Sequence, residues 1–288
     1  MYQIRSKNIY ACPEEKFHKI LWIKLIRKYK TIKTVSYKFH LSLRQLYKWK
    51  ENKNNYPLKS LMKLSEDVGQ KTIIKYIKTI KNSGVIINPK FDFIDNLELV
   101  EFLSHLLHDG GIDKQFRLHY TTHSKKLADR FNFLVNKCFG NTKPYIKKEK
   151  NKVTFYYTSV LGYIVNDVFG ILKGSKVKND VRIPKLVMNT NYKNKWRYLI
   201  TAYVCDGIKS KAAIISSSRS IEKPSNLLKN LYTICNDIGL KSVVIKKSHE
   251  YSLKDGSRHC GWILRILDKK EKEIFFKNYY DYKSCFYS

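Results

Sequence analysis

Apolar residues recur at helical spacing between residues 14 and 81, and basic residues fill many of the positions between them. The stretch 31–40 leads into a short turn at Leu41 and Ser42, and a strongly basic stretch follows over 43–50. Ser42 is a residue type that caps helices. The pattern predicts a helix-turn-helix whose second helix buries Leu43, Leu46 and Tyr47. Four polar side chains of that helix are then candidates to reach base edges: Arg44, Gln45, Lys48 and Lys50.

A further helix is expected between Pro57 and Gly69, since proline favours the first turn of a helix and glycine its end. We therefore expect residues 1–85 to form a small all-α domain of helix-turn-helix type that binds DNA. The alternative is a basic helical bundle that makes no groove contact. Gly84 and Pro89 mark the boundary after it.

Two longer units follow, over residues 90–175 and 180–288, and their hydrophobic patterns match. Each begins with an apolar helix and continues through a strand-like stretch, an amphipathic helix ended by glycine, a hairpin and a last helix. This is an internal duplication rather than a solenoid. The predicted fold class is α+β: a duplicated αββαββ(α) arrangement with pseudo-two-fold symmetry behind the small helical domain. Because both halves lie in one chain, a monomer suffices.

The first helix of each unit ends in an aspartate followed by a glycine. The two stretches are Phe102-Leu-Ser-His-Leu-Leu-His-Asp109-Gly110 and Leu199-Ile-Thr-Ala-Tyr-Val-Cys-Asp206-Gly207. Glycine commonly follows a helix, but an acid there faces the negative end of the helix dipole. A bound cation would offset that cost. Two such ends side by side would bring two carboxylates together, as in a divalent-metal site that cuts a phosphodiester.

The charge of the chain indicates a polyanionic partner. Lys and Arg number 56 against 24 Asp and Glu, which gives a formal net charge of +32, and nucleic acid is the expected partner. Part of this excess of positive charge reflects a general bias of the sequence towards lysine, which is accompanied by many Ile, Asn and Tyr residues. The sequence lacks the run of about 18 apolar residues that spans a membrane. Its six scattered cysteines disfavour a zinc site and indicate a reducing cytoplasm, where the protein would associate with the nucleoid.

Over residues 90–280 the paired motifs resemble those of the LAGLIDADG homing endonucleases, and the stretch Val181-Arg-Ile-Pro-Lys before the second motif is similar to the usual lead-in of that family. The resemblance implies two motif helices packed at a pseudo-dyad, each opening into a saddle of strands that lies in the DNA major groove. It also implies that Asp109 and Asp206, with backbone oxygens of Gly110 and Gly207, bind Mg²⁺, for which Mn²⁺ substitutes.

The same resemblance suggests the supporting residues. Lys209 matches a basic position near the acids, and His123, or else Lys114, would serve in the first half. Groove-facing candidates on the strands are Arg117, His119, Ser216 and Arg219. His105 and His108 depart from the family pattern in the first motif, where we expect them to be solvated or to lie at the helix interface.

Three functions agree with this pattern. The first is a site-specific, metal-dependent double-strand DNA endonuclease. The second is a DNA-binding transcriptional regulator that does not cleave, similar to the WhiA regulators, which also combine a LAGLIDADG-like domain with a helix-turn-helix. The third is an RNA-binding intron maturase, since a basic surface does not distinguish RNA from DNA. Metal-dependent cleavage separates the first from the others, and preference for folded RNA separates the third.

Overall fold

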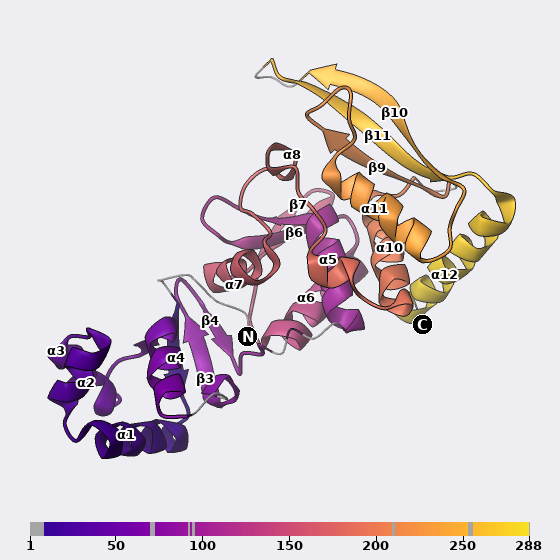
Figure 1. The fold of residues 1–288 in the computed structure, drawn as a ribbon. Coiled ribbons are helices and arrows are strands. Elements are labelled where there is room, and N and C mark those ends of the chain that lie inside the picture. Colours follow the sequence, from indigo (N-terminus) through magenta and orange to yellow (C-terminus); the bar gives the residue numbers. More distant parts are fainter. Residues whose placement is uncertain are drawn as a thin grey trace.

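The computed structural model describes residues 9–69, 73–91, 93, 96–208, 211–252 and 256–287, with the side chains of 73–74 and 285–287 left out. Three parts follow one another along an elongated molecule (Figure 1). The N-terminal part lies at one end, the first repeat in the middle and the second repeat at the other end. The predicted α+β class is confirmed. No described helix is long and apolar enough to cross a membrane.

The N-terminal part contains a sheet, so the prediction of an all-α domain is wrong. Its helices are α1 (Glu15–Tyr29), α2 (Ile32–Phe39), α3 (Leu43–Lys50) and α4 (Leu58–Asp67), followed by the short 3₁₀ helix η1 (Ile73–Tyr76). Its described strands are β1 (Tyr10–Pro13), β2 (Tyr56–Pro57), β3 (Ile77–Lys81) and β4 (Val85–Ile87), antiparallel in the order β2-β1-β3-β4. Residues 73–81, the end of the segment 14–81 in which we expected helices, form η1 and β3.

The predicted α2–turn–α3 arrangement is present, but α3 packs through a different face. Leu46 and Trp49 are buried, whereas Leu43 is 39% and Tyr47 49% exposed, so our assignment of these two as inward-facing is wrong. The side chain of Trp49 stacks on Tyr56, with ring centroids 5.0 Å apart, and this contact fixes which face of the helix is buried. Ser42 is at the N-cap without a capping side-chain hydrogen bond.

The N-terminal sheet is joined closely to the first repeat. Ile87 of β4 forms a bridge with Asn141, and the Ser83 and Ser159 hydroxyl oxygens lie 2.8 Å apart. Gly140 has a φ of +101°, and a Cβ there would come within 2.5 Å of the Asn88 carbonyl oxygen. Only glycine suits this position, because it combines left-handed backbone with the close approach of another strand.

The first repeat follows the predicted plan. It consists of α5 (Leu97–His108), β5 (Gly110–Ile112), β6 (Leu118–Thr122), α6 (Lys125–Phe139), β7 (Tyr145–Glu149), β8 (Lys152–Tyr156) and α7 (Ser159–Phe169). The strands are antiparallel in the order β5-β6-β8-β7. Asn96 caps α5 by accepting a hydrogen bond of 2.8 Å from the Leu99 amide.

A connection with two short helices, α8 (Lys176–Asn179) and α9 (Lys185–Met188), leads to the second repeat. That repeat consists of α10 (Tyr192–Asp206), β9 (Ala213–Ser218), α11 (Asn226–Asp237), β10 (Val243–Ser252), β11 (Arg258–Ile266) and α12 (Lys269–Tyr287). Its described strands are antiparallel in the order β10-β11-β9. Where the first repeat has β5, the described residues of the second show an isolated bridge between Gly207 and Ile214. The expected duplication is therefore incomplete at this point.

Helices α5 and α10 pack against each other at the centre of the two repeats (Figure 1). The Ser104 hydroxyl of α5 donates a hydrogen bond of 2.9 Å to the Tyr198 carbonyl of α10. The small side chain of Ser104 allows this close approach, because a larger group would separate the two backbones.

A buried carboxylate ties four helices around this crossing. Glu101 of α5 is fully buried and accepts two hydrogen bonds of 2.8 Å from Arg130 of α6. Arg197 of α10 lies 3.5 Å from the carboxylate, and the Tyr282 hydroxyl of α12 donates a hydrogen bond of 3.0 Å to it. The bidentate arginine and the further partners satisfy a charge that would otherwise be strongly destabilising in the interior.

We expect Glu101→Ala to lower the free energy of unfolding by about 3–5 kcal/mol, because it removes the buried carboxylate that pairs with the half-buried Arg130 and Arg197. Urea denaturation of the variant and of Glu222→Ala, an exposed acid, measures the difference. The control should change stability by less than about 0.5 kcal/mol. Equal effects of the two substitutions would contradict this role of Glu101.

Candidate active site

The two aspartates lie at the helix ends that the sequence indicates. Asp109 is the residue at which α5 stops, and Asp206 is the last residue of α10. The Asp109 carbonyl accepts a hydrogen bond of 3.3 Å from the Thr121 amide, so the strands of the first repeat begin directly at the acid. His108, the residue before Asp109, lies 2.6 Å from Asp206 across the contact of α5 with α10, so one acid from each repeat comes to the same end of the crossing.

The glycines after the acids serve close packing rather than a left-handed turn. A Cβ on Gly110 would lie 2.8 Å from the His119 carbonyl oxygen. One on Gly207, whose φ is −77°, would lie 2.2 Å from the Tyr203 carbonyl oxygen. At both acids, glycine allows the chain to leave the helix end against neighbouring backbone.

The negative charge of Asp109 and Asp206 is only partly balanced by neighbouring groups. Burial raises the pKa of Asp109, and the negative charge of Asp206 raises it further. A hydrogen bond from Cys205 and the charges of His108 and Lys176 oppose these effects. A buried carboxylate with a second carboxylate beside it attracts a cation.

His108 lies at the interface between the two repeats. Of the two positions that we expected for it, solvated or at the helix interface, the structure shows the second. Its side chain is fully buried, and Nδ1 donates a hydrogen bond of 2.6 Å to Oδ2 of Asp206. Its Nε2 is buried and has no hydrogen-bond partner within the described residues. The Asp206 side chain remains 31% exposed, which leaves the acid accessible to a ligand.

Lys176 is a site residue that sequence reasoning missed. It begins α8, in the connection between the repeats, and its Nζ donates a hydrogen bond of 3.0 Å to the Leu107 carbonyl and another to the His108 carbonyl. Burial lowers the pKa of this ammonium group, while the charges of Asp206 and Asp109 oppose the shift. No periodicity marks Lys176, because it belongs to neither repeat.

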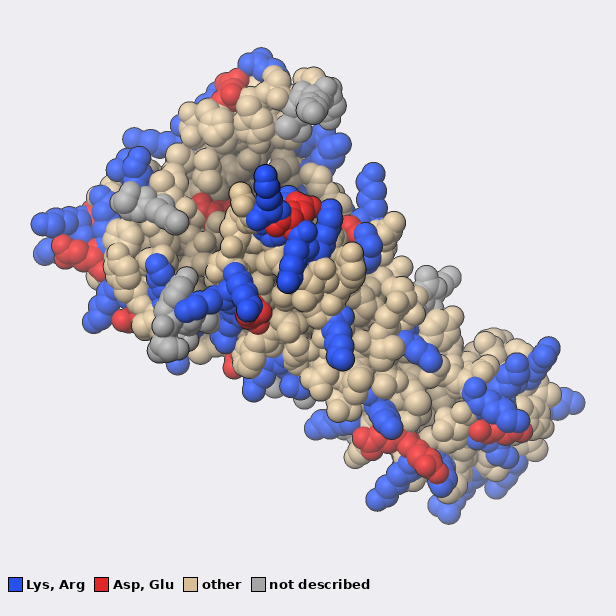
Figure 2. All heavy atoms as spheres, turned by 180° about the vertical axis from the view of Figure 1, so that it is seen from behind, with Lys and Arg blue, Asp and Glu red and all other residues tan. Residues whose placement is uncertain are grey.

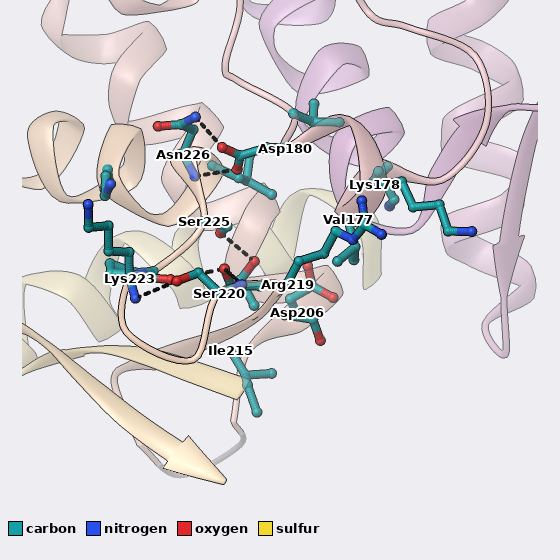
Figure 3. Close-up of a pocket in the computed structure, with 18 of the residues that line it drawn as sticks. Val177, Lys178, Asp180, Asp206, Ile215, Arg219, Ser220, Lys223, Ser225 and Asn226 are labelled. Carbon is teal, nitrogen blue, oxygen red and sulfur yellow. Dashed lines mark hydrogen bonds between the residues drawn. The ribbon is translucent and has the colours of Figure 1, made fainter. Parts of the chain in front are cut away.

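A cleft of about 710 Å³ opens beside Asp206. One wall is formed by α8 and the residues around it, the other by β9 and the loop that leads to α11 (Figure 3). The Asp180 carboxylate closes one side by accepting a hydrogen bond of 2.9 Å from the Asn226 amide. The basic residues that line the cleft are Lys176, Lys178, Arg219, Lys223 and Lys229. They outnumber the acids Asp180 and Asp206, so the cleft suits a polyanion.

Predicted residues of the second repeat are only partly described. Ser216 and Arg219 line the cleft, and the Ser216 hydroxyl lies 3.0 Å from that of Ser225. Lys209 lies outside the described residues.

Predicted residues of the first repeat lie elsewhere along its sheet. The exposed His123 ring hydrogen-bonds the Asn151 carbonyl in the β7–β8 turn, and Lys114 is exposed. Arg117 donates a hydrogen bond of 2.8 Å to Asp113 and lies over the Tyr156 ring. His119 packs against Gly111 of β5. None of these four is among the residues that line the described cleft beside Asp206.

The N-terminal candidates lie on one short helix. Arg44, Gln45 and Lys50 of α3 are exposed, and Lys48 is half-buried. Tyr37 of α2, 84% exposed, adds an aromatic side chain that the sequence analysis did not single out. Figure 2 shows lysine and arginine side chains over both the N-terminal part and the repeats, with few acids between them.

The donor set suits a hard divalent cation. The described residues contain no group of three or more His, Cys, Asp or Glu side chains that could hold a metal ion. Mg²⁺, however, uses one or two protein carboxylates and completes its shell with water and phosphate oxygens. Asp109 and Asp206, whose negative charge is only partly offset by neighbouring groups, could provide those carboxylates.

Comparisons with known proteins do not assign the chain to a family. No protein-family model matches the sequence. It is 32% identical over 136 residues to the replication factor C small subunit of Methanocaldococcus jannaschii, a match that covers 46% of this chain and 7% of that protein. The chain thus spans less than a tenth of the length of this relative.

Solved structures are similar at low identity. Mesophilic variants of the homing endonuclease I-DmoI match at a TM-score of 0.40 and 14% identity, over 64% of this chain and 94% of theirs. I-DmoI in complex with DNA and Mn matches at a TM-score of 0.39 and 16% identity, over 60% of this chain and 91% of that one. Full-length DUF199/WhiA from Thermatoga maritima matches at a TM-score of 0.36 and 14% identity, over 67% of this chain and 57% of that one.

The environment of His105 gives the stability of the protein a dependence on pH. Burial lowers the pKa of this histidine from its usual 6.5 to about 4, although the Glu101 charge opposes the shift. Its neighbours are Glu101 at 3.9 Å, Tyr120 at 3.1 Å and Cys205 at 3.5 Å. The unfolded chain therefore binds the proton more readily than the folded one between these two pKa values.

We expect this histidine to contribute about 3 kcal/mol of stability that is fully present above pH 6.5 and is lost as the pH falls through 4. Urea denaturation of the wild type and of His105→Gln over that range measures the contribution. The raised pKa of Asp109 makes stability change with pH in the opposite direction, but it does so equally in the wild type and the variant. The difference in stability between the two proteins therefore reports on His105. Identical pH profiles would contradict the assignment.

Proposed function

We propose that this chain is a site-specific double-strand DNA endonuclease that hydrolyses phosphodiesters with a divalent metal, Mg²⁺ or Mn²⁺, held by Asp109 and Asp206. The observation that carries the proposal is the pair of carboxylates, one from each repeat, at one end of the α5–α10 crossing. The raised pKa of Asp109, caused by burial and by Asp206, supports a cation between them. The protein would act as a monomer on nucleoid DNA in the cytoplasm.

Each group of the site has a part in this proposal. When bound, the metal supplies Lewis acidity at the scissile phosphate. Asp109 and Asp206 bind it, and the Gly110 and Gly207 backbone oxygens are further candidate ligands. His108 holds one oxygen of Asp206 and orients that carboxylate. Lys209 is our candidate for a cation that balances charge on the phosphate. His123, whose ring bonds the β7–β8 turn, is better suited to contact the DNA backbone.

Contacts to DNA would come from three parts of the chain. Arg117 and His119 belong to the strand region of the first repeat, and Ser216 and Arg219 to that of the second. The exposed side chains of α3, Arg44 and Gln45 among them, would add a separate contact. The net charge of +32 supports an affinity dominated by phosphates and weakened by salt.

A regulator that binds DNA without cleaving it is the second candidate, and one observation favours it. His108 and Lys176 already supply donors or charge at the helix ends, so the carboxylates have partners without any metal. In that case, the two acids would hold the repeats together and would not act on a phosphate.

Nicking of supercoiled plasmid that carries the native locus tests the proposal. We expect cleavage by the wild type with Mg²⁺ or Mn²⁺ and a loss of about 100-fold or more in Asp109→Asn, Asp206→Asn, with DNA binding retained. Asp129→Asn, an exposed acid of α6, is the matched control and should cleave normally. Salt-sensitive binding by all three proteins with no cleavage by any would contradict the nuclease and favour the regulator.

A further inference from the structure

The connection between the repeats brings a lysine to the carboxylate pair. Gly174 donates a hydrogen bond of 2.7 Å to the Ile112 carbonyl of β5, and this contact fixes the approach of the connection to the first repeat. Ser175 then caps α8 by accepting a hydrogen bond of 3.2 Å from the Lys178 amide. The Lys176 side chain is directed from this anchored turn to the last carbonyls of α5, those of Leu107 and His108.

Three negative features meet where the Lys176 ammonium lies. The first is the carboxyl-terminal end of α5, with its partial negative charge. The others are the carboxylates of Asp109 and Asp206, each of which interacts electrostatically with Lys176. The positive charge of Lys176 in turn favours the ionised form of Asp109. A single ammonium group therefore offsets part of the repulsion at the crossing.

We propose that Lys176 is a tethered counter-charge of the Asp109–Asp206 pair, which stabilises the metal-free protein and weakens the binding of a divalent cation to the same pair. This inference rests on the proposed function, since it takes the two aspartates as the metal ligands. A fixed ammonium group and an incoming Mg²⁺ repel each other, and each lowers the affinity of the carboxylates for the other. By linkage, the coupling is reciprocal.

Because Lys176 belongs to the connection between the repeats, its bond to α5 also helps to hold the repeats together when no metal is bound. A metal-free pair of repeats keeps its helix ends together, because the ammonium group bonds the end of α5 while α8 continues to Asp180, which bonds the start of α11. The connection thus holds both repeats next to the cleft. Phosphates of bound DNA would add negative charge there, and the site would then accept the metal more readily than in the free protein.

Binding of Mn²⁺ to the full-length protein, measured by electron paramagnetic resonance of the free ion, tests the inference without an activity assay. We expect Lys176→Met to bind Mn²⁺ at least about fivefold more tightly than the wild type. Lys176→Arg, which keeps the charge, should bind as the wild type does. Lys185→Met, an exposed lysine of the same connection, is the matched control for loss of one positive charge and should also match the wild type.

Thermal unfolding in EDTA and in Mg²⁺ is the second measurement. Lys176→Met should unfold at a lower temperature than the wild type in EDTA and should recover more on addition of Mg²⁺ than the wild type gains. If Lys176 only pins the connection to α5, the variant will lose stability equally in both solutions, with unchanged Mn²⁺ affinity, and the inference is overturned.

Failure of the proposed function gives a different result. If Mn²⁺ binds neither the wild type nor Lys176→Met, or binds Asp109→Asn, Asp206→Asn equally well, the aspartates are not the metal ligands, and both the metal site and the inference fall. If Mn²⁺ binds the wild type through the aspartates but Lys176→Met binds no more tightly, only the inference falls.

Discussion

The packing of α5 against α10 is the contact on which the rest of the structure depends. Ser104 bonds the Tyr198 carbonyl across it, and the small serine side chain lets the two backbones approach. Because the helices come together with their acid-bearing ends near each other, Asp109 and Asp206 share one neighbourhood. The Glu101 cluster holds α6 and α12 to the same crossing, so the outer elements of both repeats are fixed relative to the acids.

This arrangement has an electrostatic cost, and the chain offsets part of it. An acid at a helix end faces the dipole, and a second acid beside it adds repulsion. His108 offsets the cost by a hydrogen bond to Asp206, and Lys176 by bonds to the end of α5. The nuclease and the regulator differ in what completes this balance. A metal ion with DNA phosphates completes it in the first, and the protein's own side chains suffice in the second.

The sequence predicted the features that local pattern determines. The order of elements in the two repeats and the helix ends at Asp109 and Asp206 follow from periodicity and turn chemistry, and the structure confirms them apart from the strand β5, which has only an isolated bridge as its counterpart among the described residues of the second repeat. Contacts distant in sequence could not be predicted in this way. Strand β1 pairs with β3 across the whole N-terminal helical segment, so no local signal indicated a sheet.

The same limit applies to the candidate site. Leu43 and Tyr47 are apolar enough to be assigned inward, but the stacking of Trp49 on Tyr56 decides which face of α3 is buried. His108 departs from the resembling family's pattern, and its partner is on the other repeat. Lys176 lies in neither motif. These residues acquire a role only where the folded chain brings separate segments together.

The most direct test of the account is the position of a metal ion in crystals of the protein with duplex DNA of its target and Mn²⁺. Anomalous scattering locates Mn²⁺ independently of any assumption about the site. The account predicts an anomalous peak in contact with the carboxylates of both Asp109 and Asp206, one from each repeat. Bound DNA with no anomalous peak at these two side chains would contradict it.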